Sequence, residues 1–338
     1  MWQTISIYYY EHNKDALLLK MNELISTLNE KYTFKFYFRR HWKFGSHIRM
    51  NISANETDYE QIRTYLIDNL QTYLKEHPST EILNKKELLR VHKQLGKLEG
   101  ESGPFSPFMD NNTIHDTKYD DRSNHFDELD HDTMAEIMTK LSPFILQVIK
   151  STNENTKLRS IVSILLMLNF ANFEQNREVS SLSYRSHTEG FFNMISNPAQ
   201  TKEDFEKIYL DLSEDISDYS EALFMNNIGV LPEFLQQILF DWNQVINNMY
   251  LIVAANIKRT SVKAKAIQGS HAKVSDFHNH IYSSNDIRKY LDSKQFRIVR
   301  ILINFMYITL SQLGFSPKYR FFLCWVCANE IESYFGTS

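Results

Sequence analysis

A chain of 338 residues with 43% hydrophobic residues and only nine glycines and seven prolines can bury a large core, which excludes a disordered or fibrous protein. Its net charge of −4 matches a polyanion poorly, so we expect no nucleic acid among its partners. The N-terminus lacks the basic-then-apolar order of a secretory signal, and the apolar runs are short or interrupted, so we expect a cytoplasmic protein with no membrane partner.

The first hundred residues predict a strand, a helix, a hairpin and a second helix. Residues 2–10 alternate like a strand, and residues 15–28 carry apolar side chains at helical spacing. A second helix is expected to start at residues 54–58 and to stop before Pro78. This order predicts an α+β lobe over residues 1–100, in which helices cover a small mixed or antiparallel sheet.

Helical and strand periodicity both vanish between about residues 100 and 130, where Pro, Asn, Asp, Ser and His are frequent. Long segments of this kind inside a compact enzyme are usually lids, binding loops or insertions. The acidic and histidine residues lack the spacing of a calcium loop or a zinc knuckle. We therefore expect an irregular loop or lid over residues 101–133.

The second half of the chain is predicted to be mainly helical. Helical periodicity covers residues 137–150, 158–175, 201–212, 231–257, 287–310 and 317–334. The sequence therefore predicts a helical lobe over residues 134–338, an α+β fold class and one compact unit overall. Cys324 and Cys327 fall on one face of the last helix, where core packing is expected rather than a redox or metal site.

The hairpin before residue 53 carries cationic side chains where a sheet is usually apolar. Successive strand side chains point to opposite faces, so pairing the two strands gathers five polar side chains on one face: Tyr37, Arg39, His41, His47 and Arg49. This face has donors for a carboxylate, an amide oxygen or developing negative charge. Arg40 ends the opposite, apolar face and needs an acceptor there. Strand alternation alone leaves a solvated face with one structural ion pair equally open.

The same hairpin resembles the signature of the lantibiotic dehydratase C-terminal domain, the glutamate-elimination domain. The matching residues are Phe38, Arg40, Trp42, Gly45, His47 and Arg49, whereas Lys43, Phe44 and Asn51 depart from the pattern. The segments Gly103-Pro104-Phe105-Ser106-Pro107-Phe108 and Asp110-Asn111-Asn112-Thr113 are more similar to the stand-alone pyridine synthases of thiopeptide biosynthesis. Those enzymes are also similar in length to this chain.

The resemblance implies a lyase or cyclase that needs no cofactor and no metal. Such an enzyme forms the central pyridine macrocycle by formal aza-cycloaddition of two dehydroalanines in a leader-bearing azole peptide, with loss of water and of the leader. Its partners would be the leader-bearing precursor peptide and other enzymes of the pathway, and it would be a monomer or homodimer. Two alternatives stay open: glutamate elimination from glutamylated Ser or Thr, and a non-catalytic module that binds leader peptides.

Three segments are expected to contribute to one cleft: the hairpin, residues 186–192 and residues 276–285. The candidate catalytic residues are Arg40, His47, Arg49, His187, His280 and Tyr282. The candidate substrate-binding residues are Arg39, His41, Trp42, Asn112, Glu189, Phe191 and Asn285. Arginines would polarise an amide oxygen, and histidines or a tyrosine would shuttle protons. Two points stay open: Ser186 and Glu189 fit a capping box at a helix start equally well, and the resemblance does not decide between His278 and His280.

Overall fold

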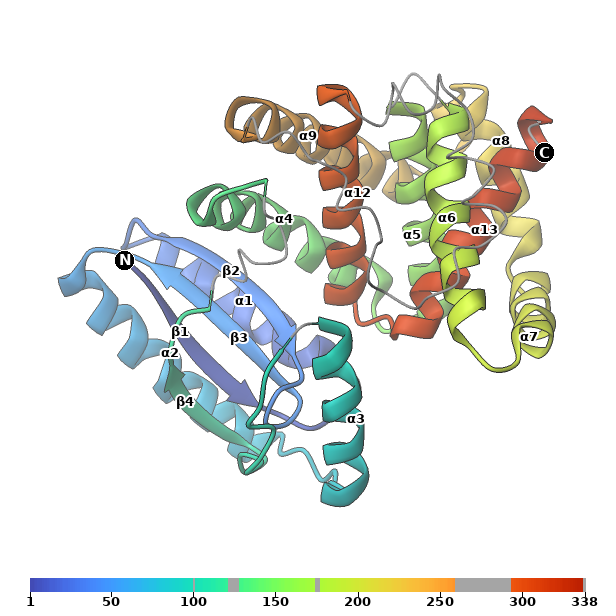
Figure 1. The fold of residues 1–338 in the computed structure, drawn as a ribbon. Helices are drawn as coiled ribbons and strands as arrows, with labels where there is room; N and C mark the ends of the chain where they lie inside the picture. Colours follow the sequence, from blue (N-terminus) through green and yellow to red (C-terminus); the bar gives the residue numbers. More distant parts are fainter. Residues whose placement is uncertain (100, 121–127, 174–176, 259–292, 337–338) are drawn as a thin grey trace. The chain divides into compact units, whose positions relative to one another are not determined.

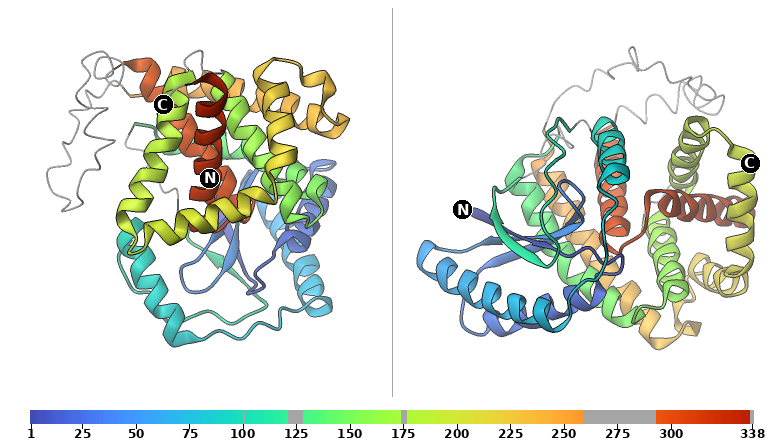
Figure 2. Two further views of the ribbon diagram at one scale, coloured as in Figure 1. Left: turned by 90° about the vertical axis from the view of Figure 1, so that its right-hand side faces the viewer. Right: turned by 90° about the horizontal axis from the view of Figure 1, so that it is seen from below.

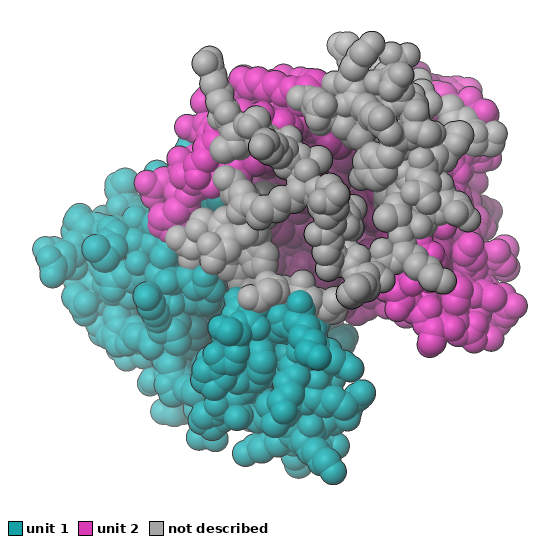
Figure 3. Space-filling view, in the orientation of Figure 1, with its two compact units in different colours: residues 1–122, 134–150 teal, residues 123–133, 151–338 magenta. Residues whose placement is uncertain are grey.

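The computed structural model describes residues 1–99, 101–120, 128–173, 177–258 and 293–336 (Figure 1). The chain divides into two compact units, each described by itself (Figure 3). Unit 1 comprises residues 1–122 and 134–150, and unit 2 comprises residues 123–133 and 151–338. The domain boundaries expected from the sequence stay predictions, whereas the α+β fold class is confirmed.

Unit 1 is built on a four-stranded antiparallel sheet in the order β2-β3-β1-β4. The strands are β1 (Trp2–Tyr8), β2 (Lys35–His41), β3 (His47–Ser53) and β4 (Thr113–Thr117). At the edge of the sheet, the backbone N–H of Phe38 in β2 donates to the Ser142 hydroxyl of α4 (His131–Thr152) at 3.2 Å. This bond uses a donor that an edge strand would otherwise leave exposed.

One face of the sheet is apolar and carries two helices. α1 (Asp15–Asn29) and α2 (Glu56–Glu76) lie side by side across it, and Figure 2 shows the two layers from other directions. The buried side chains of this face are Ile5, Ile7, Phe36, Phe38, Ile48, Met50 and Ile52. Each large apolar side chain buried here stabilises the unit by about 1.5–3 kcal/mol. Both helices were predicted, and Asn55 caps α2 by accepting from the N–H of Asp58 at 2.9 Å.

Strand β4 lies within the segment that was expected to be an irregular loop. Its residues, Thr-Ile-His-Asp-Thr, include a single aliphatic side chain, so the sequence has no apolar alternation to indicate a strand. The strand forms because its backbone pairs with β1 from Thr4 to Tyr8, a tertiary contact that outweighs weak propensity. α3 (Lys85–Glu99), in the same unit, was also not predicted.

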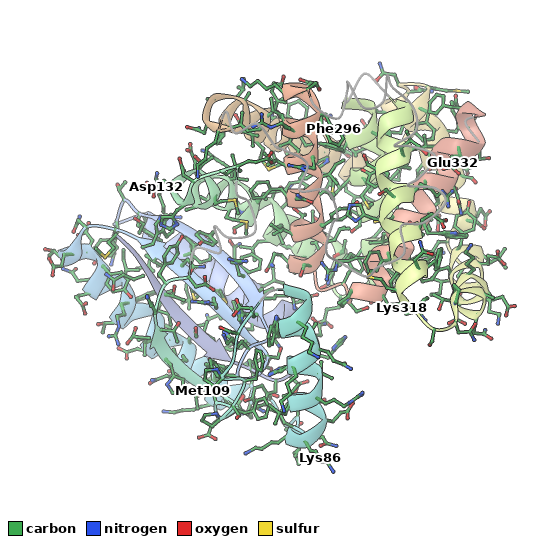
Figure 4. All side chains as sticks on the ribbon, viewed as in Figure 1. Lys86, Met109, Asp132, Phe296, Lys318 and Glu332 are labelled. Atoms are coloured by element: carbon green, nitrogen blue, oxygen red, sulfur yellow. The ribbon has the colours of Figure 1, made fainter. Side chains whose placement is uncertain are left out.

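The described part of unit 2 is helical. Its elements are α5 (Thr156–Phe173), α6 (Arg177–Met194), α7 (Pro198–Leu210), α8 (Ser213–Phe224), η2 (Ile228–Val230), α9 (Glu233–Asn256), α12 (Lys294–Gln312) and α13 (Pro317–Phe335). Helix α6 packs against α13, where Glu332 accepts from Arg185 Nε at 3.0 Å (Figure 4). In the core, Trp242 Nε1 donates to the Leu166 carbonyl at 3.0 Å. The helical second half is therefore confirmed.

The two cysteines are free thiols in the core of unit 2, as expected. Burial raises the pKa of Cys324 to about 12 and raises that of Cys327 as well, so both thiols stay protonated and unreactive. No helix in the described ranges is long and apolar enough to cross a membrane.

Candidate functional site

The polar face of the sheet in unit 1 has the composition that strand alternation predicts. In the hairpin register, His41 lies opposite His47, Arg39 opposite Arg49 and Tyr37 opposite Asn51. Like charges directly opposite each other on a sheet are destabilising. Two arginines side by side on this face therefore need acceptors, and Asp120 supplies one to Arg49.

Four aromatic rings form a row across all four strands on this face. The centroids of His41 and His47 are 5.0 Å apart, those of His47 and Tyr8 4.4 Å, and those of Tyr8 and His115 5.8 Å. The row runs from β2 through β3 and β1 to β4. We name these residues, His41, His47, Tyr8 and His115, the ring row.

The hairpin backbone fixes opposite tautomers of the two adjacent histidines when both are neutral. His47 Nδ1 donates to the Gly45 carbonyl at 2.8 Å, so Nε2 of His47 carries the lone pair. His41 Nδ1 accepts from the backbone N–H of Lys43 at 3.1 Å, so Nε2 of His41 carries the hydrogen. In their neutral forms the two rings therefore differ at Nε2, which carries a lone pair in His47 and a hydrogen in His41.

His115 also has a fixed tautomer in its neutral form. The Thr113 hydroxyl donates to the Asp110 carbonyl at 2.6 Å, which uses the only hydrogen on that oxygen. Thr113 Oγ1 therefore accepts from His115 Nε2, which lies 3.0 Å away. His115 thus keeps its lone pair on Nδ1. Strand alternation indicates Tyr8 as a member of this face, but no sequence signal identifies His115, because β4 itself was not predicted.

The loop that joins β2 to β3 holds the histidines in place through a glycine. Gly45 has φ +118°, and a Cβ atom there would lie 2.6 Å from the hydroxyl oxygen of Tyr10. That hydroxyl donates to the carbonyl of Met109, labelled in Figure 4, and Met109 N–H donates to the Phe44 carbonyl at 2.9 Å. The loop, Tyr10 and the segment before β4 therefore form one packed structure, in which Gly45 provides both the positive φ and the space.

Arg49 is held at the polar face by the segment that follows β4. Its NH2 group donates to the Lys118 carbonyl at 2.6 Å, and NH1 pairs with Asp120 at 3.2 Å. The Asp120 carboxylate offsets part of the charge that Arg39 and Arg49 bring together. The same segment extends over the sheet, where Tyr119 hydrogen bonds the Tyr37 hydroxyl at 2.9 Å.

Arg40 lies on the opposite, helix-covered face and has the acceptor that its burial requires. It pairs at 3.2 Å with Asp15, the first residue of α1, which is 2% exposed. The structure therefore does not bring Arg40 together with His47 and Arg49. Lys14 lies next to this pair, and burial, followed by repulsion from Arg40, lowers the pKa of Lys14 to about 7.

Trp42 connects the ring row to α3. Its ring is stacked with that of His41, with the two centroids 6.0 Å apart. It also contacts the rings of His92 and Phe105, at centroid distances of 4.9 Å and 5.9 Å. His92 is 1% exposed, and its Nδ1 atom has no hydrogen-bond partner in the described part of the chain. Burial lowers the pKa of His92, so this imidazole stays neutral beside the indole at physiological pH.

Asn112, predicted to bind substrate, is engaged in the backbone of its own unit. Its Oδ1 accepts from Ser79 N–H at 2.7 Å, and its Nδ2 donates to the Ser79 carbonyl at 2.9 Å. Its φ of +59° is one that asparagine tolerates better than most residues. The Asn112 amide therefore joins its own segment to the segment that contains Ser79.

The predicted residues of unit 2 lie in the middle of α6. The expectation that a helix starts after Ser186 is wrong, because α6 spans Arg177–Met194, and a capping box at Ser186 is excluded for the same reason. The residues before Ser186 are mostly polar and give little periodicity. The helix is fixed there by tertiary contacts, including the bond from the buried Tyr184 hydroxyl to the Met167 carbonyl at 2.8 Å.

Within α6, two of the predicted residues contact aromatic rings of other helices. The His187 ring meets Tyr307 of α12 at 4.3 Å between centroids, and Phe191 stacks on Phe321 of α13 at 4.3 Å. Glu189 is half-buried on the same helix. The other predicted residues, His280, Tyr282 and Asn285, and the choice between His278 and His280, lie outside the described residues. That the segments of both halves share one cleft stays a prediction.

The described side chains include no group of three or more His, Cys, Asp or Glu placed to hold a metal ion. The polar face itself offers guanidinium donors, imidazoles of fixed tautomer and a phenol. Such groups can bind an anionic or amide oxygen and move protons.

The comparisons with known proteins agree with this architecture. Residues 2–330 match the family described as lantibiotic biosynthesis dehydratase C-term. The fold is similar to that of "Pyridine synthase, TbtD, from thiomuracin biosynthesis", with a TM-score of 0.75 and 20% identity over 100% of this chain and 99% of that one. It is also similar to TsrL, with a TM-score of 0.64 and 14% identity over 99% and 95% of the two chains. No curated protein matches the chain. The chain belongs to the lantibiotic dehydratase C-terminal family.

Proposed function

We propose that this chain is a pyridine synthase of thiopeptide biosynthesis. One observation carries the proposal: the likeness to a solved pyridine synthase extends over 100% of this chain and 99% of that one. Membership of the family supports the broader role in making a ribosomally synthesised, modified peptide. The reaction would join two dehydroalanines of a leader-bearing azole peptide into a pyridine macrocycle, with loss of water and of the leader as an amide.

The first chemical requirement is to convert a backbone amide into its iminol, so that it can act as part of an azadiene. This step removes the N–H proton and adds a proton to the oxygen. His47 Nε2 carries a lone pair and the neighbouring His41 Nε2 carries a hydrogen, so the two rings, 5.0 Å apart, suit the two halves of that exchange. Either ring acting alone would leave one of the two proton transfers to solvent.

The second requirement is to stabilise negative charge on the amide oxygen as the N–H proton leaves. Arg49 is the guanidinium best placed for this, because its backbone bond to Lys118 and its pairing with Asp120 hold it on the same face as the two histidines. A donor fixed in advance needs no reorganisation during the reaction. Arg39, opposite Arg49, would add positive potential, whereas Arg40 would stabilise the hairpin through Asp15.

The third requirement is to hold a long, flexible peptide in a ring-closing pose. Trp42 and Phe191 offer aromatic surfaces to azole rings, one in each unit. We keep His187 and Glu189, with His280, Tyr282 and Asn285, as proposed contributors from the second half of the chain. The precursor peptide would be the partner, bound by its leader as well as by its core.

The test is mass spectrometry of the purified protein with a leader-linked peptide that contains azoles and two dehydroalanines. We expect a free leader amide and a ring-closed core. A parallel reaction with the glutamylated peptide examines glutamate elimination, for which loss of glutamate would be the product. Unchanged azole peptide, in a reaction where the protein binds the leader, would contradict the proposal and favour a leader-binding module.

A further inference from the structure

Tyr8 occupies the centre of the ring row, although neither the hairpin motif nor the second half of the chain points to it. It is the last residue of β1, is 3% exposed, and lies between His47 and His115. No hydrogen bond joins its hydroxyl to any described residue. Two other tyrosines of this unit differ, because Tyr10 donates to the Met109 carbonyl and Tyr37 is bonded to Tyr119.

Most of the Tyr8 side chain is buried, but its hydroxyl oxygen is not a fully buried atom, so a group that arrives from solvent can reach it. A tyrosine is usually placed so that its ring is buried and its hydroxyl meets a polar partner. The Tyr8 ring lies beside His47, whose tautomer is fixed, and the charge of Arg49 acts on the pKa of the Tyr8 hydroxyl. The hydroxyl is thus positioned for a group that arrives with the substrate.

We propose that Tyr8 is the acid that protonates the departing leader amide. This inference rests on the proposed function and adds a catalytic residue to it. In the last step, His47 removes the proton from the ring carbon, and the electron pair of that C–H bond becomes the final ring double bond. The C–N bond to the leader breaks, and the Tyr8 proton completes the N–H of the leader amide. The His47 proton then returns to the Tyr8 oxygen, so the step is balanced without another reactant.

The chemistry of the leaving group explains why a phenol fits. A departing amide nitrogen is strongly basic, so its acid must still carry a proton at neutral pH. Burial raises the pKa of Tyr8, and Arg49 lowers it by a smaller amount, so the hydroxyl is protonated throughout the physiological range. An imidazole near its ordinary pKa would be largely deprotonated there.

The experiment compares Tyr8→Phe with the control Tyr9→Phe, using the leader-linked azole peptide and mass spectrometry over time. Tyr9 is also a buried tyrosine, but its ring contacts the Lys14 amine, at 5.9 Å from the centroid, instead of the imidazoles. Tyr8→Phe should slow leader release by about 100-fold or more. It should also accumulate a species that has lost one water and still carries the leader. Tyr9→Phe should behave like the wild-type protein.

Three outcomes would overturn the inference. Leader release by Tyr8→Phe at the wild-type rate would remove the proposed role. Accumulation of unchanged substrate by a folded Tyr8→Phe protein would place any role before leader loss. A wild-type protein that binds leader but converts nothing would remove the proposed function and this inference with it, which distinguishes that failure from the first two.

A second variant separates a chemical role from a packing role. A fluorinated tyrosine at position 8 keeps the hydroxyl and lowers its pKa. The alkaline limb of the leader-release rate against pH should then move to lower pH. An unchanged profile would contradict proton donation by this residue.

Discussion

Lys14 gives a prediction about stability that does not depend on the proposed reaction. Its side chain is 3% exposed at the start of α1, its amine donates to the Glu11 carbonyl, and its pKa is lowered to about 7. In the unfolded chain the same lysine has an ordinary pKa of about 10.4. Between these two values the unfolded state binds more protons than the folded state, so this group makes the protein more stable as pH rises. Below pH 7 the Lys14 amine is protonated in both states, so the full free-energy cost of burying its charge is present.

The magnitude follows from linkage. At pH 8 the burial of Lys14 costs about 3 kcal/mol, and at pH 10 the cost is about 1 kcal/mol. Lys14→Met keeps most of the side-chain volume and removes the charge. It should therefore raise the free energy of unfolding by up to about 3 kcal/mol at pH 8 and by up to about 1 kcal/mol at pH 10, less the small contribution of the lost hydrogen bond.

The measurement is urea unfolding of both proteins at several pH values, followed by circular dichroism. The difference between variant and wild type cancels the titration of tyrosines and of other lysines. Lys20→Met, at an exposed salt bridge on the same helix, is the matched control and should change stability little at any pH. A Lys14→Met effect that is independent of pH, or that grows as pH rises, would refute the assignment of a lowered pKa.

Three further substitutions test the packing of each unit by the same unfolding measurement. Gly45→Ala should destabilise the protein by about 1–3 kcal/mol, because its φ is positive and a Cβ would overlap a tyrosine side chain, whereas Gly229→Ala has open space and should not. Tyr184→Phe removes the bond from a buried hydroxyl to the Met167 carbonyl and should cost about 1 kcal/mol. Arg40→Met, which removes the guanidinium that pairs with the buried Asp15 carboxylate, should cost up to about 5 kcal/mol. A loss below about 1 kcal/mol, the range of a surface ion pair, would count against a structural role.

Local patterns predicted much of unit 1, because its strands and helices have clear periodicity. The shared face of Tyr37, Arg39 and Arg49 and the need of Arg40 for an acceptor both follow from the alternation of strand side chains. Asp15 could not be identified as that acceptor, since the partner comes from a helix 25 positions earlier in the sequence. The sequence predicts that the buried Arg40 needs an acceptor, but only the fold shows that Asp15 is that acceptor.

The parts that were missed depend on contacts between distant segments. β4 is a strand because β1 offers a free edge, and with it His115 enters the ring row. The middle of α6 was taken for a helix start because a Ser and a Glu three positions apart resemble a cap. The local sequence is the same whether this Ser and Glu begin a helix or lie inside one. The tertiary bonds of Tyr184 and Arg185 show that they lie inside one. The tautomers of His41 and His47 are likewise set by a turn whose backbone bonds cannot be read from residue types.

The most direct test of the account is the turnover of His47→Asn measured together with its affinity for the leader peptide. Because Nε2 of His47 is the proposed proton acceptor, the variant should bind leader as the wild-type protein does and form ring-closed product at least about 100-fold more slowly. A folded His47→Asn protein that forms the pyridine product at the wild-type rate would contradict the claim that this face of the sheet carries the reaction.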